Sequence, residues 1–241
     1  MKKFIIASIF AVAAQGPASC SPPSNWMNLR ATVVLLDHGK PISASAIWRT
    51  RFLPGFSGPA KTDFQGDAIV IDLGKRGYLF ALPLGMSDGL QPNIEALTNI
   101  PDALSMSADE ARHWPDGPMR GRIEYRNSVI KRQMGRPIPI CLTAGPRDVR
   151  RVCLTLVRFL NPNDPATARF VDPHNLAATY GPGIALRTMQ LEITSQPRTL
   201  SDLSMLPWLA SRQSGWIAGG RSSSLPPDAA HSLTASNFRS K

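Results

Sequence analysis

The stretch DAIVIDLGKRGYLFALPLG, residues 67–85, decides the fold class of this chain. Two apolar runs rich in β-branched and aromatic residues, residues 69–71 and 78–80, flank residues 74–77 (GKRG), which have the composition of a four-residue hairpin turn. Neither run alternates with polar residues, so both faces of each strand should be covered. We therefore predict an antiparallel hairpin at the centre of the hydrophobic core.

Further strands lie on both sides of this hairpin in the sequence. Residues 29–37 (LRATVVLLD) and 41–52 (PISASAIWRTRF) are expected to make an antiparallel pair around a short turn. Residues 184–194 (IALRTMQLEIT) alternate apolar and polar side chains with one phase slip near Thr188, which predicts a β-bulge. Residues 53–66 carry four Gly and Pro residues in their first seven positions and should form a loop.

Together these patterns predict a single mainly β domain of the α+β class over residues 29–212. We expect an antiparallel sheet or sandwich with a few short helices. The segment LPWL (206–209) near the end of the domain should supply an apolar plug. The remaining residues, 213–241, are rich in Gly, Ser and Pro and lack a core pattern, so we expect a disordered tail.

One short helix is expected within FVDPHNLAATYGPG (170–183). Asp172 is a suitable N-cap and the proline after it suits the first helical position. Gly181, followed by a proline, should end the helix. His174 falls in the first turn and should be exposed, so neither catalysis nor metal binding is expected from this loop.

The first 19 residues, MKKFIIASIFAVAAQGPAS, have the composition of a secretory signal peptide. Two lysines precede an apolar run of eleven residues, which is shorter than the roughly 20 residues needed to cross a membrane. Cleavage before Cys20 would give a lipid-anchored protein, although a proline lies three positions before that cysteine. Cleavage after Ala13 would release a soluble periplasmic protein. We favour lipidation of Cys20, with a tether over residues 20–28, and a membrane-anchored lipoprotein that faces the periplasm.

The other two cysteines lie in two apolar runs that a turn-like segment separates. Cys141 is part of PIPICLTAG, and Cys153 is part of RRVCLTLVRFL. If the two runs form a hairpin, the cysteines lie opposite each other and close enough for a disulfide. The alternative is a pair of buried free thiols. We favour the disulfide. Cys20 is then the one cysteine without a partner, and lipidation would account for its presence in an exported protein.

Positive charge is concentrated in residues 112–151. The whole chain has 27 Lys and Arg residues against 17 Asp and Glu residues. Ten basic residues lie in this stretch against three acidic ones: Arg112, Arg120, Arg122, Arg126, Lys131, Arg132, Arg136, Arg147, Arg150 and Arg151 against Asp116, Glu124 and Asp148. Only two aromatic residues, Trp114 and Tyr125, are interleaved, so a base-stacking surface is missing and no nucleic-acid partner is expected. Two interpretations remain, attraction to an anionic envelope surface and a solvated arginine-rich excursion.

Three segments carry a resemblance: DAIVIDLGKRGYLFAL, LNPNDPATARFVDPHNLAATYGPGIALRTMQLEIT and LPWL. Together they resemble a family of small, uncharacterised proteobacterial envelope proteins, many with lipoprotein signals. The similarity extends over residues 29–209 and is densest after Val157. The resemblance implies an N-terminal signal, one domain and the LPWL ending, and it implies no catalytic residues.

Catalytic motifs are sparse. Residues 85–89 (GMSDG) match the G-x-S-x-G pattern of serine hydrolases, with Ser87 as nucleophile and His174 or His231 as base. A glycine and a proline interrupt the helix that should follow, so a glycine-rich turn is the simpler interpretation. The four histidines lack metal-ligand spacing and no phosphate or dinucleotide motif occurs, so no metal and no cofactor are expected. We expect a non-catalytic binding or structural module, with a serine hydrolase using Ser87 as the alternative.

Overall fold

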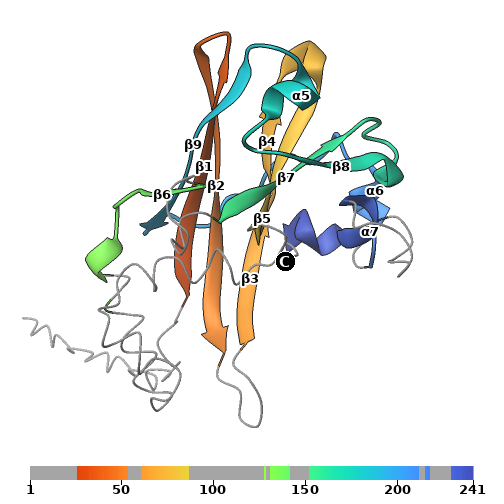
Figure 1. Cartoon of the computed structure of the whole chain (residues 1–241). Coiled ribbons are helices and arrows are strands. Elements are labelled where there is room, and N and C mark those ends of the chain that lie inside the picture. Colours follow the sequence, from red (N-terminus) through yellow and green to blue (C-terminus); the bar gives the residue numbers. More distant parts are fainter. Residues whose placement is uncertain are drawn as a thin grey trace, which may run out of the picture.

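The structure is a computed structural model that describes residues 26–53, 61–86, 128, 131–141, 152–211, 215–217 and 229–240. In these parts the chain forms two antiparallel β-sheets and a few short helices (Figure 1), which confirms the predicted mainly β, α+β class. One sheet has six strands in the order β10-β3-β2-β1-β9-β6. The other has four strands in the order β4-β5-β7-β8.

The strands of the six-stranded sheet are β1 (Met27–Asp37), β2 (Lys40–Leu53), β3 (Lys61–Asp67), β6 (Ile138–Ile140), β9 (Ile184–Thr194) and β10 (Arg239–Ser240). Those of the four-stranded sheet are β4 (Ile69–Asp72), β5 (Tyr78–Met86), β7 (Cys153–Phe159) and β8 (Ala168–Val171). The α-helices of the described residues include α5 (Leu176–Tyr180), α6 (Trp208–Ser211) and α7 (Ala229–Ser232). Single 3₁₀ turns are η1 (Gly74–Arg76), η3 (Pro165–Thr167) and η4 (Ala235–Asn237).

The hairpin of β4 and β5 forms as predicted, with η1 as its turn. Ile69 of β4 pairs with Ala81 of β5 in antiparallel register. Both faces of β5 are covered: Leu79 and Ala81 belong to one hydrophobic core, whereas Phe80 and Leu82 belong to a second one on the opposite face. The consecutive apolar residues of β5 therefore mark a strand that is buried on both sides.

The first core lies between the two sheets. Apolar side chains from β1, β2, β6 and β9 meet those from β4, β5 and β7 there. The alternation expected of a half-buried strand is visible in β1, where every second residue from Met27 to Leu35 is buried. The two sheets thus form the two layers of a sandwich (Figure 1).

β1 and β2 form the predicted antiparallel pair. Asp37 pairs with Lys40, so only two residues make the turn between the strands. These two residues, His38 and Gly39, have φ angles of 47° and 81°. Such left-handed conformations are what a two-residue hairpin turn requires, because they match the twist of the flanking strands.

The bulge predicted near Thr188 is confirmed. β1 also pairs with β9, and the register between them shifts between Val34 and Leu35. Thr188 lies opposite Val34. Leu186 lies opposite Leu35, which leaves Arg187 as an extra residue in β9. The interruption in the alternation of apolar and polar residues is therefore caused by one inserted residue.

The outer face of the four-stranded sheet is covered by the C-terminal part of the chain. The LPWL segment supplies three buried apolar side chains to the second core, as expected. The prediction of a disordered tail is wrong for residues 229–240, which form α7, η4 and β10 (Figure 1). Phe238 is fully buried at 0 % exposure, and β10 pairs with β3. The folded domain therefore extends beyond the predicted boundary at residue 212.

Two other predicted boundaries change. Residues 61–66 were expected in a loop, but they belong to β3, in which Phe64 pairs with Thr50 of β2. The tether predicted over residues 20–28 is too long, because β1 begins at Met27 and this side chain is buried. In both places tertiary contacts outweigh a weak local pattern.

Several predicted features lie outside the described residues. These are the leader, Cys20, Ser87 and most of the arginine-rich stretch, of which the structure describes Ser128 and residues 131–141. Within the described ranges, no helix combines the length and the apolar character that a membrane span requires.

Candidate functional site

A disulfide joins Cys141 and Cys153, the pair favoured from the sequence. Their sulfur atoms are 1.99 Å apart and their Cα atoms 4.2 Å apart. The expected hairpin within one sheet is wrong, however, because Cys141 follows β6, which pairs with β9, and Cys153 begins β7 of the other sheet. The bridge therefore links the two layers of the sandwich. By restricting the unfolded chain, such a bridge stabilises the fold by about 3 kcal/mol.

A pocket of about 420 Å³ lies beside this disulfide. Its walls are the end of β6, the first half of β9, and the start of α5 with the loop before it. The lining consists of Ile140, Cys141, residues 173–177 and residues 184–189. Ligand pockets usually have volumes of about 300–1,000 Å³ and combine apolar walls with a few polar groups. This pocket has a volume in that range, and its lining is about equally polar and apolar.

Turn chemistry shapes the wall that carries His174. The side chain of Asn175 caps α5 by accepting a hydrogen bond of 3.3 Å from the backbone N–H of Ala178. Asp172, the predicted N-cap, instead accepts a hydrogen bond of 2.8 Å from the backbone N–H of His174. The predicted cap is therefore wrong by three residues. An Asx turn at Asp172 precedes the helix and holds His174 beside the pocket.

The far end of α5 is fixed to the four-stranded sheet. The hydroxyl of Tyr180 donates a 3.0 Å hydrogen bond to the carbonyl oxygen of Tyr78, and Arg158 donates one of 2.6 Å to the carbonyl oxygen of Thr179. Burial raises the pKa of Tyr180, and the nearby charge of Arg158 lowers it by less. The hydroxyl thus stays protonated and keeps its donor role. These bonds make α5 a firm wall for the pocket.

The opposite wall is the bulged part of β9. Arg187, the extra residue of the bulge, is exposed, and so is His174. Within the part of the chain that the structure describes, the Arg187 guanidinium has no hydrogen-bond or ion-pair partner. Bulges often occur at binding sites because they redirect one side chain. Here the bulge places a cationic group at the pocket.

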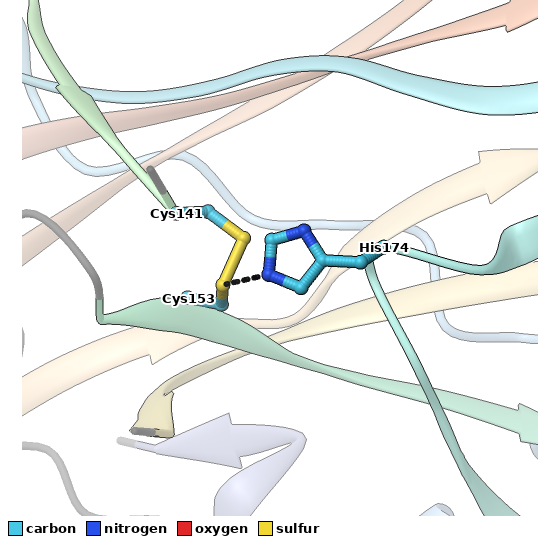
Figure 2. Close-up of side chains that lie close together, drawn as sticks. All are labelled: Cys141, Cys153 and His174. Carbon is cyan, nitrogen blue, oxygen red and sulfur yellow. Dashed lines mark hydrogen bonds between the residues drawn. A yellow bond between two sulfur atoms is a disulfide. The ribbon is translucent and has the colours of Figure 1, made fainter. Parts of the chain in front are cut away.

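The imidazole of His174 points toward the disulfide (Figure 2). Its Nε2 atom lies 3.9 Å from the Sγ atom of Cys153. The two sulfur atoms and a ring nitrogen of His174 all lie within 4.8 Å of one another. His174 is exposed, as predicted, whereas both cysteines are buried. No motif spacing predicts this group, because its members come from the residue after β6, the first residue of β7 and the loop before α5.

The structure describes only some of the residues proposed for the alternative function, a serine hydrolase. Ser87 lies outside the described residues. Of the two candidate bases, His174 lies beside the disulfide, whereas His231 is part of α7, whose alanines belong to the second core. The hypothesis that Ser87 is a nucleophile therefore stays a prediction.

Comparisons with models of protein families, with curated proteins and with solved structures found no match to this chain. A function must therefore be inferred from the chemistry of the pocket and of the disulfide beside it.

Proposed function

We propose that this chain is an exported, lipid-anchored protein of the cell envelope that acts as a non-catalytic binding module. The leader and Cys20 support export and anchoring, since their order along the chain is that of a lipoprotein signal. The disulfide supports an oxidising compartment, because such bridges persist outside the cytosol. The arginine-rich stretch 112–151 would hold the module close to an anionic envelope surface.

The pocket beside the disulfide is the binding site in this proposal, and its ligand is an amphiphilic anion. Leu186 and Ala177 offer accessible apolar surface that suits a hydrocarbon or aromatic group, and the buried side chains of Ile140, Leu176, Ile184 and Met189 lie beneath it. Arg187, at the bulge of β9, suits an acidic head group. The observation that carries this proposal is the combination of a pocket of mixed polar and apolar lining with a guanidinium that has no partner among the described residues.

The two parts of the pocket should contribute unequally to affinity. Burial of apolar surface is worth about 25 cal/mol per Å². An exposed ion pair contributes about 0–1 kcal/mol. The apolar walls should therefore supply most of the binding free energy, and Arg187 should supply the preference for an acid.

Filling the pocket is expected to abolish most of this binding. The probe is 8-anilinonaphthalene-1-sulfonate, which joins apolar rings to a sulfonate and fluoresces in apolar surroundings. In titrations of the folded protein, Ala177→Trp should weaken probe binding at least about tenfold, a loss of about 1.4 kcal/mol. Arg187→Gln should weaken it by roughly threefold to fivefold, in line with the strength of exposed ion pairs.

Matched controls lie close by. Ala178 is an exposed residue of the same helix that does not line the pocket, so Ala178→Trp should leave binding unchanged. Arg136 is an exposed arginine outside the pocket, and Arg136→Gln should have no effect either. Equal probe affinity in Ala177→Trp and the unmodified protein would show that this pocket is not the binding site.

A further inference from the structure

We propose that reduction of the Cys141–Cys153 disulfide turns this corner of the pocket into a zinc site with Cys141, Cys153 and His174 as ligands. Thiolate sulfur and imidazole nitrogen are the donors that Zn²⁺ prefers in proteins. In the oxidised protein the sulfur atoms are bonded to each other and cannot act as thiolate ligands. The site would therefore exist only in the reduced protein.

The donor atoms already lie close to the distances that zinc requires. Zn–S bonds of about 2.3 Å and Zn–N bonds of about 2.0–2.1 Å in a tetrahedral site place sulfur and nitrogen about 3.5 Å apart, and two sulfurs about 3.8 Å apart. The Nε2 atom of His174 is 3.9 Å from the Sγ atom of Cys153. Breaking the disulfide lets the sulfurs separate toward the required spacing through side-chain rotation alone.

Besides the disulfide, hydrogen bonds also hold the backbone around these side chains. The N–H of Cys141 donates a 3.0 Å hydrogen bond to the carbonyl oxygen of Val152, which holds the two cysteine segments together. Three residues of β6 pair with β9, and β7 pairs with both β5 and β8. The Asx turn at Asp172 fixes the backbone of His174. The three ligands should therefore stay together after reduction.

The pocket supplies the fourth position of the site. Cys141 and His174 both line it, so a zinc ion held by three protein ligands would be accessible from the pocket. Zinc sites with three protein ligands keep an open position for water or another small ligand. An acidic group bound near Arg187 would be placed to occupy that position.

The chemistry balances without any group beyond a thiol reductant and the metal. A dithiol reductant transfers two electrons and two protons to the disulfide, which yields two cysteine thiols and the disulfide of the reductant. Zn²⁺ then displaces the two thiol protons, which pass to solvent, and binds both thiolates and neutral His174.

The test uses Co²⁺ as a spectroscopic probe, followed by displacement with Zn²⁺, on the chain from Cys20 onward with Cys20→Ser. The reduced protein should bind one Co²⁺ per chain and show thiolate-to-cobalt charge transfer and the intense visible bands of tetrahedral cobalt. Zn²⁺ should remove these bands. The oxidised protein should show none of them, and Zn²⁺ should raise the unfolding temperature of the reduced protein alone.

His174 provides the decisive variant, because it is exposed and we expect its replacement to leave the fold intact. His174→Ala should weaken Co²⁺ binding by at least the 10- to 100-fold seen when outer partners of a metal site are removed. The control His38→Ala removes another exposed histidine and should bind like the unmodified protein. Absence of tetrahedral cobalt bands in the reduced protein, or equal affinity in His174→Ala, would overturn the proposal.

Discussion

Replacing Phe238 with alanine is expected to lower the free energy of unfolding by about 3–5 kcal/mol, the usual cost of removing a buried aromatic ring. Phe238 is 0 % exposed. Its ring centroid lies 5.6 Å from that of Phe159, 5.7 Å from that of Trp208 and 6.2 Å from that of Phe80. The substitution removes these contacts and leaves a cavity over the four-stranded sheet. Urea unfolding followed by tryptophan fluorescence measures the loss.

The matched control is Leu200→Ala. Leu200 is 73 % exposed, so its truncation should change stability by at most about 0.5 kcal/mol. A disordered tail predicts the opposite outcome for Phe238, since a residue that contacts nothing costs nothing when removed. Equal stability of Phe238→Ala and the unmodified protein would therefore contradict the packing of residues 229–240 on the second core.

Trp48→Ala is expected to cost a similar amount, about 3–5 kcal/mol. Trp48 lies between the sheets with 1 % exposure, and its indole N–H donates a 2.8 Å hydrogen bond to the carbonyl oxygen of Asp67. Its ring packs edge-on against Phe64 with 5.9 Å between centroids. The substitution creates a cavity and leaves a buried carbonyl group without this donor. The same urea titration measures the effect.

Gly66 makes a sharper test of the same contact. A Cβ atom at this position would overlap Cδ1 of Trp48 and lie 2.9 Å from its Cγ. Gly66→Ala should therefore cost about 1–3 kcal/mol through overpacking. In the Trp48→Ala background the same change should cost less, because the nearest obstacle is gone, although Cζ of Phe64, at 3.1 Å, remains in tight contact. Additive effects in the double variant would show that the indole does not lie against Gly66.

The parts of the fold that are predictable from the sequence are those in which burial leaves a local pattern. The hairpin of β4 and β5 combines two uninterrupted apolar runs with a glycine-bounded turn. β9 shows both its alternation and its bulge, because one inserted residue shifts every later side chain to the other face. These features depend on neighbours in the chain, so a single sequence is sufficient to find them.

The missed elements lack such patterns. β3 has the sequence KTDFQGD with Phe64 as its single large apolar residue, so it does not stand out from the preceding loop. Residues 229–240 form elements of two to four residues, too short for a helical or strand period to be visible. Both are stabilised by contacts with distant segments, which no local propensity reflects.

The candidate site also has features that the sequence predicts and features that it does not. The pairing of Cys141 with Cys153 was predicted from a hairpin that does not form, because the two segments pair with β9 and with β5 in different sheets. His174 was predicted to be exposed in the first turn of a helix, and the structure places it, exposed, in the loop before α5. Its approach to the disulfide was missed, because β7 and that loop meet only in the folded sandwich. The position of Arg187 at the pocket could not be predicted from the sequence, because it depends on the bulge between β9 and β1.

The most direct test of the central claim, export of a lipid-anchored and disulfide-bridged module, is intact-mass analysis of the full chain recovered from bacterial cell fractions, with and without thiol alkylation. We expect a membrane-bound product that begins at Cys20 and carries the added mass of a lipid. Without prior reduction, Cys141 and Cys153 should not be alkylated, and Cys20→Ser should remove the lipid mass. A cytosolic product that begins at Met1 and carries three alkylated cysteines would contradict the account.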